Sequence, residues 1–221
     1  MITAGWTWQG LAVPDPWNFN IRNDALLDAL VPATARRVCD VGCGDGFLSA
    51  RLARRVPEVT AVDADAPVLE RARTRFPDSP VTWLHADVMT AELAPRSFDA
   101  VVSNATLHHL DDAAAALARL GGLLVPGGTL AAVTFVRGRP QDLPWQAVAW
   151  AFRSAVRLRR STWEHSAPVR WPPADTLPGL RRAASTTLPG ARVRRLVDGR
   201  VLLTWTAPPG QRNPGEPPPG A

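Results

Sequence analysis

The chain is 221 residues long and 46% hydrophobic, so it can bury one sizeable core but is short for two independent domains. It contains no apolar run of the roughly 20 residues that a membrane-spanning helix needs, and its N-terminus lacks the basic start and apolar stretch of a secretory signal. Its two cysteines, Cys39 and Cys43, are too few for a disulfide framework or a zinc site. We therefore expect a single cytoplasmic domain with no membrane association, and the oligomeric state stays open.

The net positive charge lies in the second part of the chain. Residues 1–137 hold 12 Arg against 15 acids, whereas residues 138–221 hold 13 Arg against 5 acids, and no Lys occurs. A basic region of this kind suits an anionic substrate or RNA. A charge run is more often a solvated surface, however, and the interleaved basic and aromatic residues of an RNA-binding module are not visible. We therefore expect no nucleic-acid partner.

Residues 36–136 alternate short Val-rich runs with longer amphipathic stretches, which is typical of βαβ units around a parallel sheet. The predicted strands are 37–41, 59–62, 81–85, 98–102 and 129–135. The predicted helices are 47–55, 68–75 and 111–124, the last opened by Asp111 and Asp112. Pro126-Gly127-Gly128 is expected to turn the chain into the fifth strand. This pattern predicts a doubly wound α/β fold.

The remaining elements follow residue 137. The pattern predicts helices at 144–160 and 174–184, then strands at 193–197 and 201–205 as an antiparallel hairpin around Asp198-Gly199. We expect residues 1–207 to form the domain, with small cap regions at 1–22 and 138–172. The Pro- and Gly-rich residues 208–221 cannot build a core, so we expect a disordered tail.

The sharpest motif runs from Asp40 to Gly46, where a buried strand enters a helix. Glycine lets the backbone turn sharply and lets a ligand approach closer than a side chain would allow. The dinucleotide fingerprint G-x-G-x-x-G does the same for a pyrophosphate. Here the spacing is G-x-G-x-G, and Phe47 stands where that fingerprint has glycine. The loop therefore favours a ligand without a pyrophosphate.

Two acids follow at the ends of the next strands. Asp63 ends the second strand about 20 residues beyond the loop, where a carboxylate accepts hydrogen bonds from ribose hydroxyls. Asp87 occupies the equivalent place after the third strand. Either acid can instead cap a turn or helix, and Asp65 is interpreted as such a cap.

Together, Asp40–Gly46, Asp63, Asp87 and the segment after the fourth strand resemble the motifs of class I S-adenosylmethionine-dependent methyltransferases. The similarity is to the small-molecule, type 11/12-like subgroup, and the N-P-P-Y motif of amino-directed DNA enzymes is missing. The resemblance implies a seven-stranded sheet of order 3-2-1-4-5-7-6 with the seventh strand antiparallel. It also implies S-adenosylmethionine as cofactor and a small-molecule methyl acceptor, in bacterial secondary metabolism.

The resemblance assigns roles to individual residues. Asp40, Gly42, Gly44 and Asp63 would hold the methionine and ribose, and Asp87 would accept from the adenine amino group. The full expected cofactor site is Asp40, Gly42, Cys43, Gly44, Asp63, Ala64, Ala86, Asp87, Val88, Ser103 and Asn104.

An oxygen or nitrogen acceptor must lose a proton, and histidine is suited to take it. His108 and His109 follow the fourth strand, and we expect only one of them to point inward, with a slight preference for His109. The alternative is that both merely orient the loop. His165 is a second candidate base, and no spacing of His and acids indicates a metal site.

Seven of the nine Trp fall outside the expected cofactor core, at positions 6, 8, 17, 145, 150, 163 and 171. The resemblance implies that the N-terminal segment and the insertion meet over the cofactor. These Trp residues would then either wall an apolar acceptor pocket or fix a cap to the sheet.

Three other functions stay open at this point. An RNA methyltransferase would use the basic second part, and a noncatalytic partner protein would keep only the fold. A nicotinamide dehydrogenase is disfavoured by Phe47 and by the absence of any Tyr or Lys as proton donor.

Overall fold

The computed structural model describes residues 17–160, 163 and 171–209. It contains one seven-stranded sheet of order β3-β2-β1-β4-β5-β7-β6. The strands are β1 Arg37–Val41, β2 Glu58–Asp63, β3 Val81–His85, β4 Phe98–Asn104, β5 Leu124–Thr134, β6 Arg192–Arg195 and β7 Val201–Thr206. The first five strands are parallel, and β7 runs antiparallel to β5 and β6. The predicted topology is therefore confirmed.

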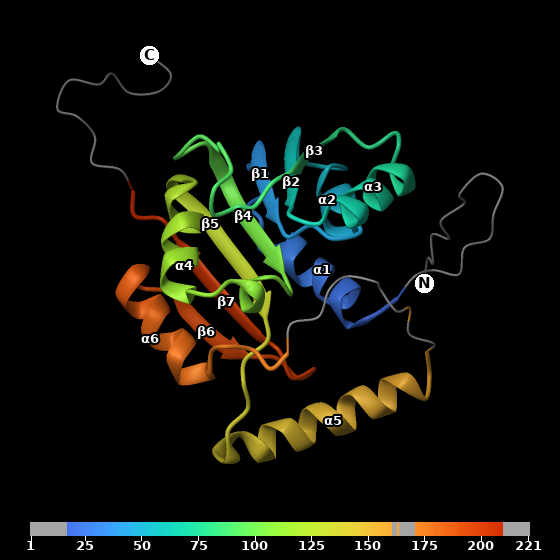
Figure 1. The fold of residues 1–221 in the computed structure, drawn as a ribbon, viewed down its shortest axis with the longest axis vertical. Helices are drawn as coiled ribbons and strands as arrows, with labels where there is room; N and C mark the ends of the chain where they lie inside the picture. The colour runs from blue at the N-terminus through green and yellow to red at the C-terminus, as the bar shows by residue number, and fades with distance from the viewer. Residues whose placement is uncertain (1–16, 161–162, 164–170, 210–221) are drawn as a thin grey trace.

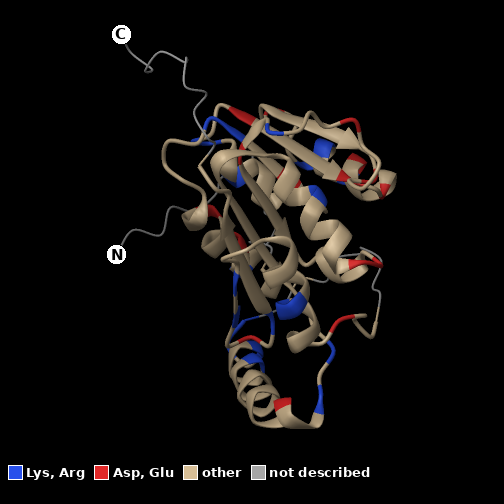
Figure 2. Cartoon of the chain, turned by 90° about the vertical axis from the view of Figure 1, so that its left-hand side faces the viewer, with Lys and Arg blue, Asp and Glu red and all other residues tan. Residues whose placement is uncertain are grey.

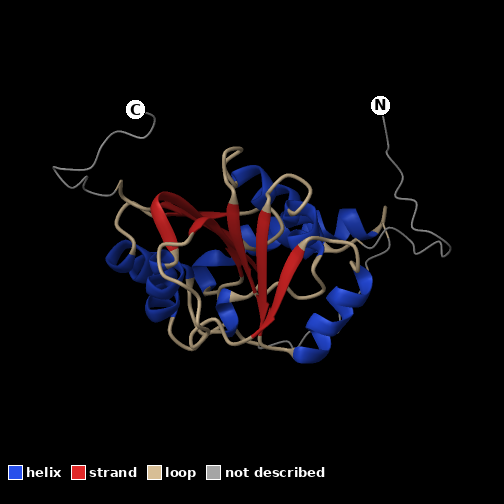
Figure 3. Cartoon of the chain, turned by 90° about the horizontal axis from the view of Figure 1, so that it is seen from above, coloured by secondary structure: helices blue, strands red, loops and turns tan. Residues whose placement is uncertain are grey.

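Helices cover both faces of the sheet, as Figure 1 and Figure 3 show. The helices are α1 Phe19–Leu30, α2 Phe47–Leu52, α3 Ala66–Arg75, α4 Ala113–Gly122, α5 Leu143–Arg157 and α6 Leu177–Thr187, with short 3-10 turns η1 Leu107–His109 and η2 Pro140–Asp142. Leu117 and Leu120 of α4 share one core with Leu180 of α6. Leu27 of α1 and Leu52 of α2 belong to a second core on the other face. The sheet thus separates two apolar layers.

Polar side chains fix where several helices begin. The Asp65 carboxylate accepts from the Val68 N–H at 3.0 Å, which confirms Asp65 as a helix cap. Asp112 accepts from Ala114 and Ala115 at the start of α4. Thr176 caps α6, so that helix begins after Thr176 rather than at the predicted residue 174.

Two further local features differ from the sequence prediction. Helix α1 was not predicted, because Asn23 and Asp24 are buried on it and interrupt the apolar period that would reveal it. Strand β5 begins at Leu124 rather than Thr129, since Pro126-Gly127-Gly128 forms a bulge within the strand and not a turn before it. The register between β4 and β5 shifts at this bulge.

Helix α5 lies at the lower edge of the molecule in Figure 1. Its inner side is fixed to the β6–β7 turn, because Trp145 Nε1 donates to the Leu196 carbonyl at 3.0 Å and Arg153 donates to the Asp198 carbonyl at 2.8 Å. Trp150 on its outer side is 67% exposed. No described helix is long and apolar enough to span a membrane. The predicted tail lies almost wholly outside the described residues.

Candidate active site

A cavity of about 1040 Å³ lies at the C-terminal edge of β1, β2 and β4. Twelve of the predicted site residues line it, namely Asp40, Gly42, Cys43, Gly44, Asp63, Ala64, Ala86, Asp87, Val88, Asn104, His108 and His109. Ser103 does not line the cavity. Its side chain is buried and its hydroxyl donates to the Val41 carbonyl at 2.9 Å, which joins β4 to β1. His165 lies outside the described residues.

The three positions of the loop after β1 that hold glycine need it for different structural reasons. All three have positive φ, at +69°, +53° and +81° for Gly42, Gly44 and Gly46. A Cβ on Gly42 would lie 2.0 Å from Oγ1 of Thr106, and one on Gly46 would lie 2.6 Å from the Trp83 ring. A Cβ on Gly44 would meet nothing within 4 Å. Gly44 is therefore the glycine whose missing side chain leaves room in the cavity.

The predicted acids lie around this loop. Asp63 accepts from the Gly44 N–H at 2.8 Å and from the Asp65 N–H at 2.9 Å. Asp40 is 1% exposed and accepts from the Ser49 hydroxyl at 2.6 Å. Burial raises the pKa of Asp40 to about 7, against the lowering effect of Ser49, and the nearby Asp63 raises it further. Asp87 accepts from the Met89 N–H at 2.9 Å at the exposed rim.

His108 and His109 both line the cavity. The expectation that only one of the two rings points inward stays a prediction. Their ring centroids lie 4.1 Å apart. The His108 backbone N–H donates to Thr134 Oγ1 at 3.1 Å, and the His108 ring packs edge-on against Phe135. Burial lowers the pKa of His108 to about 4, and His109 and Arg200 lower it further. His108 is therefore neutral at physiological pH.

Sequence reasoning missed a polar cluster that links α1 to the end of β4. Asn104 Nδ2 donates to Asp24 Oδ1 at 2.7 Å and to the Asn20 carbonyl at 2.8 Å. Burial raises the pKa of Asp24 to about 8, although the hydrogen bond from Asn104 lowers it. Asn20 and Asp24 both line the cavity. No local motif marks them, since their role depends on a helix that the apolar pattern did not reveal.

Arg200 was also missed. It precedes β7 at the end of the β6–β7 turn and lines the same cavity. Its Nη2 donates to Asn20 Oδ1 at 2.7 Å, across 180 residues of sequence. The only sequence signal that could have indicated Arg200 as a site residue was its position as a basic residue directly after the predicted Asp198-Gly199 turn.

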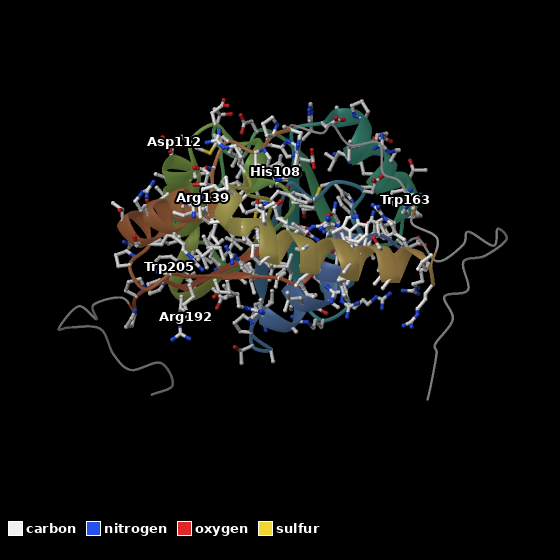
Figure 4. The ribbon with its side chains drawn as sticks, turned by 90° about the horizontal axis from the view of Figure 1, so that it is seen from below. His108, Asp112, Arg139, Trp163, Arg192 and Trp205 are labelled. Carbon is white, nitrogen blue, oxygen red and sulfur yellow. The ribbon has the colours of Figure 1, made fainter. Side chains whose placement is uncertain are left out.

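Two of the seven Trp residues outside the core, Trp163 and Trp171, line the cavity. The Trp163 N–H donates to the Trp17 carbonyl at 2.7 Å, so the N-terminal segment and the insertion do meet. Figure 4 shows Trp163 on the side of α2 and α3, with His108 nearer the middle of the molecule. Trp145 and Trp150 belong to α5, and Trp6 and Trp8 lie outside the described residues.

Comparison with known proteins decides the family. The family model for a methyltransferase domain matches residues 39–132. An uncharacterized methyltransferase of Mycobacterium tuberculosis is 59% identical over 193 residues, which cover 87% of this chain and 98% of that protein. The chain belongs to the S-adenosylmethionine-dependent methyltransferases. The resemblance in the sequence motifs is thereby confirmed.

Two more distant matches are methyltransferases with named functions. A ubiquinone biosynthesis O-methyltransferase of Alkalilimnicola ehrlichii is 37% identical over 112 residues, covering 49% of this chain and 45% of that protein. The structure of phosphoethanolamine N-methyltransferase 2 of Haemonchus contortus, in complex with S-adenosylhomocysteine, has a TM-score of 0.62 at 19% identity and covers 88% of this chain and 54% of that one. The latter similarity shows the fold alone.

Within the described part of the methyltransferase, no group of three His, Cys, Asp or Glu side chains is arranged to hold a metal ion. In the view of Figure 2, basic and acidic segments are interspersed over the ribbon.

Proposed function

We propose that this methyltransferase binds S-adenosylmethionine in the cavity and transfers its methyl group to an oxygen of a small organic acceptor. The observation that carries the proposal is the charge of the cavity wall. Six aspartates line it, at positions 24, 40, 45, 63, 65 and 87, against one described arginine. Burial keeps Asp24 protonated at neutral pH, and Asp45 pairs with Arg71 and Arg75, so the acidic character of the wall comes from the other four. S-adenosylmethionine carries a sulfonium and an ammonium, whereas a dinucleotide carries phosphates, so an acidic wall favours the former.

The residues at the loop after β1 fit this cofactor. Gly44 leaves open space beside the Asp63 carboxylate, which has capacity to accept from ribose hydroxyls besides its two backbone donors. Asp87 stands at the rim, where it would accept from the adenine amino group. Asp40 has a pKa of about 7 because of burial, and a nearby ligand cation would favour its charged form.

The cofactor supplies both the methyl electrophile and its leaving group when bound, so the protein mainly orients the acceptor and excludes water. The other end of the cavity, lined by Asn104, the two histidines, Phe135 and Trp171, would hold the acceptor. His109 is the preferred group to take a proton from a hydroxyl acceptor, because the low pKa of His108 makes it a weak base. An oxygen acceptor agrees with the O-methyltransferase relative, and a setting in bacterial secondary metabolism stays a prediction.

Calorimetric titrations with S-adenosylmethionine, S-adenosylhomocysteine and NAD in parallel test the proposal. We expect the first two to bind and NAD not to bind. Binding of NAD alone, or of none of the three, would overturn it. Once an acceptor is known, His109→Ala is expected to slow turnover while leaving cofactor affinity unchanged.

A further inference from the structure

Arg200 is a buried cation at the acceptor end of the cavity. The residue is 7% exposed, and its guanidinium carbon lies 4.5 Å from the centre of the Phe135 ring. Phe135 in turn packs against His108 and Trp171, which line the same cavity. A guanidinium stacked on an aromatic ring keeps its edge free for planar, bidentate partners. Arg200 is therefore removed from solvent, with an aromatic ring covering its guanidinium.

The positive charge around Arg200 is not balanced by the described side chains. Asp198 is the carboxylate that pairs with it, with Nη1 of Arg200 and Oδ2 of Asp198 3.2 Å apart. The same carboxylate oxygen lies 3.9 Å from Arg22, and the carbonyl of Asp198 accepts from Arg153 at 2.8 Å. Two guanidinium groups thus share one carboxylate, and a third bonds to the backbone carbonyl of the same residue.

Asp24, an acid of the same cavity wall, does not compensate for this positive charge. Its pKa of about 8, raised by burial, keeps it protonated at neutral pH. Burial lowers the pKa of Arg200 to about 10, with Asp198 raising it and Arg153 and Arg22 lowering it. Because this pKa is still well above 7, Arg200 is charged at neutral pH. Its Nε is buried without a hydrogen-bond partner among the described residues. A buried cation with spare donors and two cationic neighbours favours an anion beside it.

We propose that the methyl acceptor carries a carboxylate and that Arg200 binds this carboxylate at the wall formed by Phe135, His108 and Trp171. The inference rests on the proposed function, because it treats this end of the cavity as the acceptor site. A carboxylate matches the planar fork of arginine, and the aromatic wall suits an apolar body attached to it. Its binding also brings the local charge closer to neutral.

The test compares carboxylic acids with their uncharged amides. Phenylacetate, octanoate and glutarate are titrated into the protein saturated with S-adenosylhomocysteine, each beside its primary amide, and Kd is measured by calorimetry. We expect at least one acid to bind tenfold or more tightly than its amide. Arg200→Gln is expected to abolish that preference, whereas Arg200→Lys keeps part of it because the charge remains.

Arg22→Gln is the matched control, because Arg22 faces the same Asp198 carboxylate but does not line the cavity. It should change the acid affinity by less than threefold. The double variant Arg200→Gln/Asp198→Asn removes both charges of the pair and so tests Arg200 even if the single variant unfolds.

Two outcomes would overturn the inference: acids that bind no better than their amides, or an acid preference that survives Arg200→Gln. Failure of S-adenosylhomocysteine to bind would instead refute the proposed cofactor. In that case, titration of the same acids and amides into the free protein still tests whether Arg200 binds a carboxylate.

Discussion

The Nδ2 of Asn104 and the Oδ1 of Asp24 form a 2.7 Å hydrogen bond between the end of β4 and helix α1. The bond couples the cavity to a helix that also packs against α2 and β5. Because Asp24 is buried, its pKa rises from 3.8 to about 8 in the folded protein. This contact therefore holds a neutral carboxylic acid at physiological pH.

The raised pKa of Asp24 predicts a pH dependence of stability. A raised folded-state pKa contributes stability that is fully present below about pH 4 and is lost as pH rises through about 8. Asp24→Asn keeps an oxygen for Asn104 but cannot ionise, so the fall in unfolding free energy between pH 5 and pH 8 should shrink by at least about 1 kcal/mol. Urea denaturation at several pH values measures it. Parallel curves for the two proteins would show that Asp24 is not protonated in the fold.

Substitutions of Gly42 and Gly44 should separate an effect on stability from an effect on cofactor binding. Gly42→Ala places a Cβ 2.0 Å from Oγ1, 2.3 Å from Cγ2 and 2.6 Å from Cβ of Thr106, so no rotation of that side chain relieves the overlap. We expect a loss of more than about 2 kcal/mol of stability. Gly44→Ala meets nothing within 4 Å and should cost only the left-handed strain, about 1 kcal/mol.

The cofactor affinity of the Gly44→Ala variant should nevertheless fall tenfold or more, because its Cβ takes up space in the cavity. Thermal melting and calorimetry, run on both variants, provide the two readouts. Unchanged S-adenosylmethionine binding by Gly44→Ala would mean that the cofactor does not approach this glycine.

His108 should titrate well below a normal histidine. Burial, His109 and Arg200 lower its pKa to about 4, so its contribution to stability is present above about pH 6.5 and is lost as pH falls towards 4. Arg200→Gln removes a nearby cation and should raise the pKa of His108. Imidazole NMR resonances, assigned with His108→Gln, measure the shift. A pKa near 6.5 in the wild-type protein would contradict the burial seen here.

Asp63 should be needed for cofactor binding more than for folding. Asp63→Ala removes the carboxylate that accepts from Gly44 and Asp65, and we expect the Kd for S-adenosylmethionine to rise tenfold or more, about 1.4 kcal/mol. Asp112→Asn, at the cap of α4 and outside the cavity lining, is the control and should leave the affinity within threefold. Equal losses in both variants would indicate a general loss of folded structure.

The cofactor half of the cavity was predictable because its residues follow the ends of successive strands. Each strand of this half has an apolar run that is visible in the sequence, and its functional residue lies at the end of the strand or shortly after it. These residues are Asp40, Gly44, Asp63 and Asp87. In a parallel sheet these ends meet at one edge, so local patterns alone bring the residues together. Ser103 is a predicted cofactor residue that does not line the cavity, because a strand end has two faces and its side chain bonds to β1.

The acceptor half was decided by tertiary structure. Asn20 reaches Arg200 across 180 residues, and Asp24 reaches Asn104 across 80, through contacts that no local periodicity encodes. Sequence by itself determined the alternation of strands and helices, the glycine loop and the family of the protein, because those depend on short-range patterns. The strand order followed from the resemblance to that family. Only the folded chain decided which buried charges face one another, because the pKa of Asp24 and the charge excess at Arg200 depend on burial and on distant neighbours.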